Sequence, residues 1–241
     1  MTGAENPMLQ SKIKILCVAF AVVVLLIHCA IAQDANPFSV LPIPEELNGG
    51  YSATRQLDGR WLIAGGHRRQ RSGFGRGPDG KSLWGPGNAS EQVILFDPTT
   101  SNWTNTGAMT TKHSYHRATL LADGRVLVTG GVDTQGDLSS AEIYDPASGE
   151  WTKTGSLNIV RRSHTSTLLA DGRVLVAGGV ADGTNYNPHF NSFASAELYD
   201  PATEKWTMTT PMSVARFGHA AILLTNGLVL AAGGKELVRA R

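Results

Sequence analysis

Basic side chains gather in one short stretch of the chain, "HRRQRSGFGRGPDGKSLWGPGN", which begins at residue 67. The charged residues between positions 67 and 82 give a local charge of +4, in a protein whose net charge is +1: Arg68, Arg69, Arg71, Arg76, Lys81 and Asp79. A cationic loop attracts anionic partners such as an acidic polysaccharide, a lipid surface or an acidic protein. Its mixture of Gly, Arg and Phe is also typical of RNA-binding segments, but the export predicted below argues against a nucleic acid. The alternative is a solvated loop without a partner.

A second stretch, "ADGTNYNPHFNSF" at residues 181–193, carries amide and aromatic side chains. These groups suit polar ligands such as sugars, because amides donate and accept hydrogen bonds while aromatic rings stack. The candidate ligand-binding residues in it are Asn185, Tyr186, Asn187 and His189. The alternative is an Asn-rich turn. Since His67 and His189 have no neighbouring carboxylate, the sequence predicts no metal site and no cofactor.

Other polar residues recur at equivalent positions along the chain and are interpreted as scaffold. Three histidines share one such position, and three aspartates, each followed by proline, share another: His116, His164, His219, Asp97, Asp145 and Asp200. The aspartates are suited to capping the turn before the proline. Glu142 and Glu197 recur together with Arg161 and Arg216, which predicts buried Glu–Arg pairs between repeats. No catalytic residue is predicted, because no pair of carboxylates is set for acid and base chemistry.

The recurrence comes from a phrase that occurs four times, at residues 55–66, 120–131, 168–179 and 223–234; the third copy reads "LLADGRVLVAGG". Each copy ends in two glycines, and each of the first three is followed by an aromatic-Asp-Pro sequence with a tryptophan seven residues beyond the aromatic. The landmarks are Gly65, Gly66, Gly130, Gly131, Gly178, Gly179, Gly233, Gly234, Trp103, Trp151, Trp206, Tyr144 and Tyr199. Successive tryptophans are 48 and then 55 residues apart.

Each repeat indicates four short strands, and no segment after the N-terminal apolar run has a helical period. An Asp-Gly or Asn-Gly pair between the first and second strands predicts a two-residue hairpin. In "RVLVA" both faces of the second strand are apolar, so both must be covered. Stacked antiparallel sheets achieve this, and four strands with a period near 50 residues are typical of a β-propeller blade. The glycine pair lets a neighbouring backbone approach where a Cβ would obstruct it.

The glycine pair after an apolar strand, followed by an aromatic and a tryptophan, resembles the kelch repeat. The version with "DGRVLVAGG" and "AELYDPAT" is similar to kelch proteins of the galactose-oxidase-like central-domain group. The resemblance covers residues 51–234 and implies an all-β propeller of four-stranded antiparallel blades, with complete blades at 51–107, 113–157 and 161–210 and half a blade at 216–234. Closed propellers have at least four blades. We therefore expect a truncated propeller, or an open partial ring that associates through exposed strand edges.

The connection between the second and third strands varies most among the repeats. It holds 27 residues at 67–93, 10 at 132–141 and 17 at 180–196. All three connections should leave the sheets at equivalent places and share one rim. Function is expected at this rim, because loops on a rigid scaffold are free to vary.

The first 32 residues have the pattern of a secretory signal peptide. Lys12 and Lys14 precede a 17-residue apolar run, and small residues at Ala30 and Ala32 offer a cleavage site before Gln33. Residues 33–50 are then an extended leader. The predicted location is secreted or otherwise extracytoplasmic. The alternative is a membrane anchor that stays uncleaved and holds an exported domain, which would be the only contact with a membrane.

Two functions compete on this evidence. The first is a secreted binding module whose variable loops contact a carbohydrate or protein partner. The second is a fragment of a secreted carbohydrate-active enzyme or oxidase whose active site lies outside this chain. The resemblance to galactose oxidase implies a copper-radical site that needs a cysteine, but Cys17 and Cys29 both lie in residues 1–32. No residue carries over to that role, so the sequence favours the binding module over an enzyme.

Overall fold

The computed structural model of the protein describes residues 49–67, 89–182 and 190–236. Contacts divide the chain into residues 1–42 and residues 43–241, and every described residue belongs to the second unit. The predicted signal segment and leader thus lie outside the described residues, apart from the last two positions of the leader.

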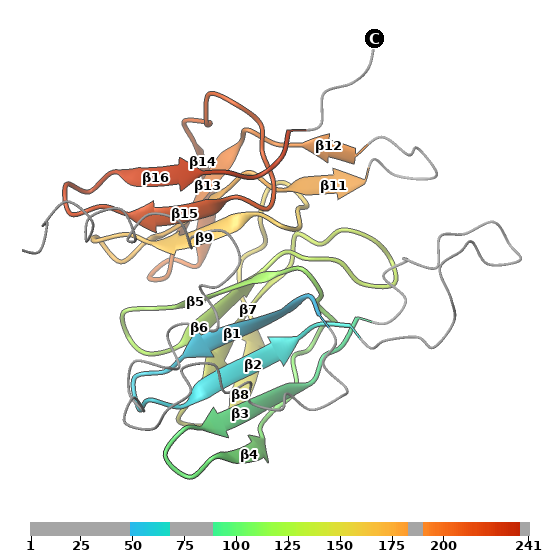
Figure 1. Cartoon of the computed structure of the whole chain (residues 1–241), viewed down its shortest axis with the longest axis vertical. Coiled ribbons are helices and arrows are strands. Elements are labelled where there is room, and N and C mark those ends of the chain that lie inside the picture. Colours follow the sequence, from blue (N-terminus) through green and yellow to red (C-terminus); the bar gives the residue numbers. More distant parts are fainter. Residues whose placement is uncertain (1–48, 68–88, 183–189, 237–241) are drawn as a thin grey trace, which may run out of the picture. The chain divides into compact units, whose positions relative to one another are not determined.

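The described residues form strands joined by turns (Figure 1). The strands are β1 (Tyr51–Arg55), β2 (Trp61–Gly65), β3 (Val93–Asp97), β4 (Asn102–Asn105), β5 (Arg117–Leu120), β6 (Val126–Thr129), β7 (Ala141–Asp145), β8 (Glu150–Lys153), β9 (Thr165–Leu168), β10 (Val174–Ala177), β11 (Val180–Asp182), β12 (Phe190–Ser192), β13 (Ala196–Asp200), β14 (Lys205–Thr209), β15 (Ala220–Leu223) and β16 (Val229–Ala232). This confirms the predicted all-β class.

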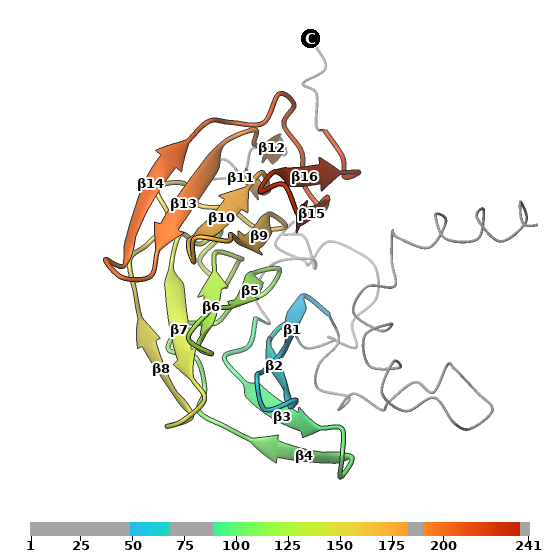
Figure 2. The same ribbon diagram turned by 90° about the vertical axis from the view of Figure 1, so that its left-hand side faces the viewer.

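Three four-stranded antiparallel sheets follow one another along the chain, in the orders β1-β2-β3-β4, β5-β6-β7-β8 and β9-β10-β13-β14. The hairpin β11–β12 is inserted between the second and third strands of the third sheet, and β15–β16 forms a separate two-stranded sheet. The first strands of consecutive sheets contact each other, β1 with β5, β5 with β9 and β9 with β15. Figure 2 shows the sheets fanning out from these strands. The arrangement confirms kelch-like propeller blades.

Apolar residues from neighbouring sheets fill the space between them. Val126 and Val128 of β6 pack with Leu62 of β2, whereas Val174 and Val176 of β10 pack in a second cluster with Leu127. The second strand of the middle sheet is thus covered on both faces, as its sequence predicts. Burying each such side chain stabilises the fold by about 1.5–3 kcal/mol.

The large aromatic residues tie each sheet to the one before it. The rings of Tyr144 and Trp151 lie 5.1 Å apart, and those of Tyr199 and Trp206 lie 4.9 Å apart. Trp151 Nε1 donates a hydrogen bond of 2.9 Å to the carbonyl of Gly107, which belongs to the segment after the first sheet. Since the indole is otherwise apolar, it fills the wedge between sheets while its N–H is satisfied.

The glycine pairs lie where consecutive sheets approach most closely. Gly178 has φ +66°, and a Cβ added there would lie 2.5 Å from the carbonyl oxygen of Arg216 and 2.7 Å from the ring of His219. Both atoms belong to the chain that leads into the next sheet. Any other residue would therefore need both an unfavourable backbone conformation and a displaced neighbour, which confirms the predicted close approach.

The turns between first and second strands differ from the predicted two-residue hairpins. Leu169 N donates to Arg173 O, and Gly172 N donates to Leu169 O, so three residues form the loop. Among the described Asp-Gly turns only the glycine has a positive φ, which is +85° at Gly172. A two-residue type I′ turn needs two such residues. The turn is thus a type I turn closed by a left-handed glycine.

Candidate functional site

The sequence-predicted ligand-binding residues lie outside the described residues. Arg68, Arg69, Arg71 and Arg76 fall in residues 68–88, and Asn185, Tyr186, Asn187 and His189 fall in residues 183–189. The structure does describe the positions from which both stretches depart, because β2 and β3 flank the first stretch and β11 and β12 flank the second.

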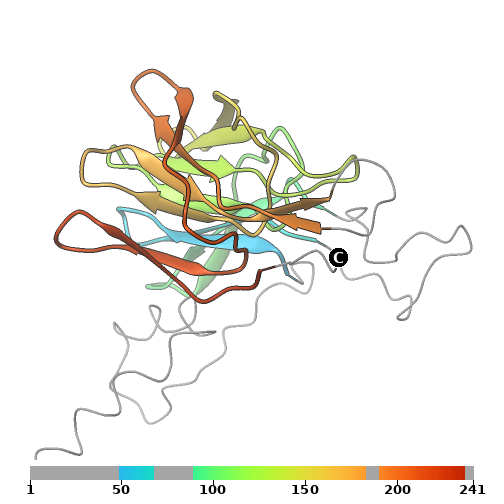
Figure 3. The same ribbon diagram turned by 90° about the horizontal axis from the view of Figure 1, so that it is seen from above.

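These positions form one layer of the molecule, which we call the loop rim: His67, Ser114, Tyr115, Val132, Asp137, Arg162, Val180, Phe217 and Lys235. Isolated bridges link the residue after the second, third and fourth glycine pairs to the chain that enters a sheet, as in Ser114 with Val132 and Arg162 with Val180. After the first pair, His67 bridges to Ala89 instead. Strands β11 and β12 extend from this layer at the end of the sheets where β2 finishes (Figures 1 and 3). The second-to-third-strand connections therefore share a rim, as predicted.

A chain of backbone hydrogen bonds runs through the loop rim from sheet to sheet. Tyr115 N donates to Gly50 O at 2.8 Å, Ser163 N donates to Tyr115 O at 3.0 Å, and Gly218 N donates to Ser163 O at 2.8 Å. All three donor residues have left-handed backbones, with φ of +55°, +54° and +61°. Three equivalent positions thus hold Tyr, Ser and Gly in the same backbone conformation, and only their side chains differ.

Tyr115 is the most exposed of the large apolar residues on the loop rim, with 44% of its surface accessible. Its ring stacks on that of His67, with centroids 5.5 Å apart and an angle of 26° between the planes. The Nδ1 of His67 is 3.2 Å from Ser114 Oγ, and partial burial lowers the pKa of His67. The imidazole is therefore neutral at pH 7, and together the two rings offer an aromatic surface rather than a cation.

Sequence reasoning missed Tyr115. The left-handed backbone conformation destabilises the fold by about 1 kcal/mol or more at Tyr115, whereas Gly218 adopts the same conformation without strain. The signal that could have revealed it is the residue just before each recurring histidine, which changes from Tyr115 to Ser163 to Gly218 while its neighbours repeat.

An ion pair joins two sheets at the loop rim. Arg162 Nη1, on the chain that enters the third sheet, donates to Asp137 Oδ1 in the connection between β6 and β7. The two side chains are only 13% and 3% exposed. The same connection is closed by Asp133, whose carboxylate accepts hydrogen bonds from the backbone of Gln135 and Gly136. This part of the loop rim is consequently held in one conformation.

The recurring histidines are buried scaffold, as predicted. Burial lowers the pKa of His116 and His164 well below the ordinary value and that of His219 to about 4. Their Nε2 atoms lie within hydrogen-bond distance of a hydroxyl group, 2.8 Å from Ser52 for His116 and 3.0 Å from Thr129 for His164. Neutral rings in these places act in packing rather than in proton transfer.

The recurring aspartates cap turns, also as predicted. Asp97, Asp145 and Asp200 each accept a hydrogen bond from the backbone N–H two residues further on, at distances of 2.8, 2.8 and 2.9 Å. These hydrogen bonds close the turn between the third and fourth strands, so the carboxylates belong to the scaffold.

The prediction of buried Glu–Arg pairs between repeats is wrong, although one buried Glu–Arg pair forms within a repeat. Arg161 Nη2 is 2.9 Å from Glu197 Oε1, and both side chains are fully buried. The pair connects the chain that enters the third sheet with β13 of that same sheet, rather than two separate repeats. Glu142 is paired with His113 instead, at 3.3 Å. Burial would raise the pKa of Glu142, but hydrogen bonds from His113 and the backbone of Thr110 outweigh it and lower the pKa.

Within the described residues, no group of three or more His, Cys, Asp or Glu side chains could hold a metal ion. Over the same ranges, no helix is long and apolar enough to cross a membrane. A family model described as the kelch motif matches residues 113–158 and again residues 161–213, which contain the second and third sheets. A search of curated proteins found no match.

Proposed function

Because the chain is a kelch-repeat protein, we propose that it is a non-catalytic binding module whose loop rim contacts a protein partner. Kelch repeats generally mediate protein interactions. The observation that carries the proposal is the difference among equivalent rim positions on a scaffold that otherwise repeats. The position before each recurring histidine is Tyr115, Ser163 or Gly218, although all three share one backbone conformation.

The side chains on the loop rim are of the kinds that protein interfaces use. Tyr115 presents a half-exposed ring that is already oriented by its stacking on His67. Arg162 directly precedes Ser163, whose backbone N–H donates a hydrogen bond to the carbonyl of Tyr115. Its side chain is held by the ion pair with Asp137. Tyrosine and arginine contribute most to binding when they are rigid before the partner arrives, because less side-chain entropy is lost.

The protein-partner proposal is tested by capture from extracellular fluid with the full chain as bait, comparing the wild type with Tyr115→Ser. Serine is the residue that stands at the equivalent position in the third sheet, so the backbone can accept it. We expect the partner to bind at least about tenfold more weakly to the variant. Ser163→Ala, at that equivalent position, is the matched control and should bind normally. Equal capture by Tyr115→Ser would refute a role for the loop rim.

A carbohydrate is the second candidate ligand, because both loop sequences with ligand-like composition depart from the loop rim. Residues 68–88 carry the basic cluster, and residues 183–189 carry amide and aromatic groups. A glycan array that includes acidic polysaccharides tests this with Arg68, Arg69 and Arg71 changed together to alanine. Binding of acidic glycans that is lost in the triple variant supports the basic loop, and binding that is unchanged discards it.

We also propose that the protein is exported and cleaved before Gln33, which rests on the apolar run of residues 15–31 and the small residues that follow. N-terminal sequencing of protein isolated from its native host decides between cleavage and a retained anchor. A mature protein that begins at Gln33 supports secretion. A protein that still contains Ile15 supports the anchor.

A further inference from the structure

The turns between first and second strands share one backbone conformation, but the last of them differs in chemistry. The first three turns have an aspartate before the glycine, as in Asp171-Gly172, whereas the turn between β15 and β16 has Asn226-Gly227. The two glycines have φ of +85° and +83°. Asp171 and Asn226 each accept a hydrogen bond of 3.1 Å from the backbone N–H two residues further on. The fourth turn therefore keeps the local fold of the others with an amide in place of a carboxylate.

An arginine binds the aspartate in each of the first three turns. Arg60, Arg125 and Arg173 donate from Nε to the carboxylate two residues earlier, at 2.7, 2.8 and 2.8 Å. The hydrogen bonds from Arg173 lower the pKa of Asp171, so its carboxylate is ionised at neutral pH. An ionised carboxylate resists attack by a backbone nitrogen. In the fourth turn the equivalent residue is Leu228, whose side chain has no donor.

The Asn226-Gly227 turn is open to water. Both residues are exposed. The side chains of the equivalent aspartates in the three complete sheets are 46%, 49% and 49% exposed, so exposure is a property of this position in every sheet. A Cβ placed on Gly227 would meet no atom within 4 Å. Because glycine has no Cβ, its backbone nitrogen can approach the preceding side chain without steric hindrance.

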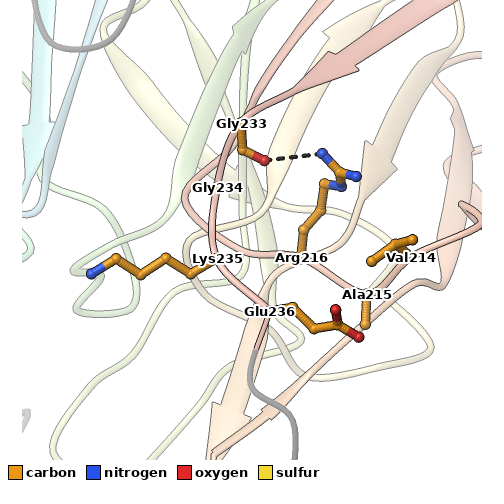
Figure 4. Close-up of a pocket in the computed structure, with 7 residues that line it drawn as sticks. All are labelled: Val214, Ala215, Arg216, Gly233, Gly234, Lys235 and Glu236. Carbon is orange, nitrogen blue, oxygen red and sulfur yellow. Dashed lines mark hydrogen bonds between the residues drawn. The ribbon is translucent and has the colours of Figure 1, made fainter.

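The β15–β16 hairpin is held at its other end, next to the loop rim. There Arg216 Nη1 donates to the carbonyl of Gly233 at 3.0 Å (Figure 4). The turn itself is closed by hydrogen bonds of exposed residues, such as that from Gly227 N to Leu224 O at 3.0 Å. Exposed turns of this kind open locally while the rest of a sheet stays formed. The backbone nitrogen of Gly227 is then free to react.

We propose that Asn226 is a site of spontaneous deamidation, in which water replaces the side-chain amide. The backbone nitrogen of Gly227 attacks Cγ of Asn226, and the new bond closes a five-membered imide, which proximity favours. The Cγ–Nδ2 bond breaks and ammonia leaves. Water then opens the imide at either of its two carbonyl carbons, which yields aspartate or isoaspartate. The net reaction consumes one water and releases one ammonia.

The two products affect the turn differently. Aspartate at position 226 makes a fourth Asp-Gly turn and keeps the acceptor for the N–H of Leu228. Isoaspartate lengthens the backbone by one carbon, which disturbs the register that pairs Leu223 with Val229. Phe217 and Lys235, which belong to the loop rim, lie at the opposite end of this hairpin. The modification site therefore does not depend on the proposed function.

The test incubates the purified full chain at mildly alkaline pH, because the attacking nitrogen must lose its proton. Mass spectrometry then follows the tryptic peptide of residues 217–235 against an unincubated sample. We expect a peptide that is heavier by the difference between an amide and a carboxyl group, with both aspartate and isoaspartate at position 226. Asn226→Gln would have to close a six-membered ring, so conversion should fall at least about tenfold. Equal conversion in that variant would overturn the proposal.

Other positions in the same chain provide internal controls. Asn102 is exposed but is followed by Trp103, whose Cβ hinders attack, so it should keep its amide. Asp171 precedes a glycine but is bound by Arg173, so it should form no isoaspartate. The Asn-Gly pair at residues 48–49 falls in a different tryptic peptide and is scored separately.

A synthetic peptide with the sequence of residues 217–235 supplies the time scale, because it shows when a free Asn-Gly pair has reacted fully. A folded chain that has formed both products at Asn226 by that time supports the proposal. A folded chain in which Asn226 is still intact would overturn it. Conversion of Asn102 at the same rate would also overturn it, because the glycine would then have no role.

Discussion

Replacing Glu197 by glutamine should destabilise the protein more than any other change of a single charge that the structure describes. The carboxylate is fully buried and accepts hydrogen bonds from Arg161 and from the backbone N–H groups of Asn158 and Ile159. Glutamine keeps the shape but leaves the guanidinium of Arg161 buried without a counter-charge. Removing one partner of a buried pair costs about 3–5 kcal/mol, which is a large fraction of the 5–15 kcal/mol by which a domain of this kind is stable.

The assay is urea unfolding followed by tryptophan fluorescence, since Trp151 and Trp206 lie between the sheets. The matched control is Asp171→Asn, which removes a carboxylate from an exposed pair with Arg173 whose side chains are 49% and 46% accessible. Solvent screens an exposed pair of this kind, so its loss should change the stability little. A loss below about 1 kcal/mol for Glu197→Gln, or equal losses for both variants, would refute the reasoning that this pair holds β13 in place.

Three further predictions concern the scaffold and the loop rim. Gly178→Ala should lower the unfolding temperature more than Gly172→Ala, because both glycines have positive φ but a Cβ meets neighbouring atoms only at Gly178; equal decreases would contradict the close approach of consecutive sheets. Tyr115→Gly should raise the free energy of unfolding by about 1 kcal/mol, because glycine adopts the left-handed backbone without strain. The same change should weaken partner binding, because it removes the exposed ring. A lower stability would mean that the stacking of Tyr115 on His67 outweighs the backbone strain. Acidification from pH 7.5 to 5 should lower the unfolding temperature. The histidines of the unfolded chain take up protons below about pH 6.5, whereas burial lowers the pKa of the folded histidines, to about 4 for His219. An unfolding temperature that is unchanged at pH 5 would contradict buried neutral histidines.

The repeated scaffold could be predicted from the sequence because its physical causes are local and occur several times. An apolar second strand, a glycine pair and an aromatic-Asp-Pro turn each have one physical explanation, and their recurrence in the same order excludes coincidence. The Asp-Gly turn was harder, because the dipeptide is compatible with both two-residue and three-residue loops. Only the backbone shows that Gly172 alone adopts a positive φ.

The candidate site could be predicted only in its position. Unequal spacing after the glycine pairs indicated a shared rim, but Tyr115 belongs to the scaffold segment that leads into β5 and has no loop-like composition. Its significance depends on exposure, stacking and φ, which are properties of the folded chain. For the same reason the sequence paired Glu142 with an arginine, although the position equivalent to Arg161 is His113 in the second sheet.

Hydrogen exchange of the chain with and without its captured partner tests the role of the loop rim most directly. We expect slower exchange at residues 114–115 and 132–138, which lie on the rim, and no change at the Asp-Gly turns of residues 123–124 and 171–172, at the opposite end of the sheets. Protection at the Asp-Gly turns without protection at the rim would contradict the assignment of binding to the loop rim.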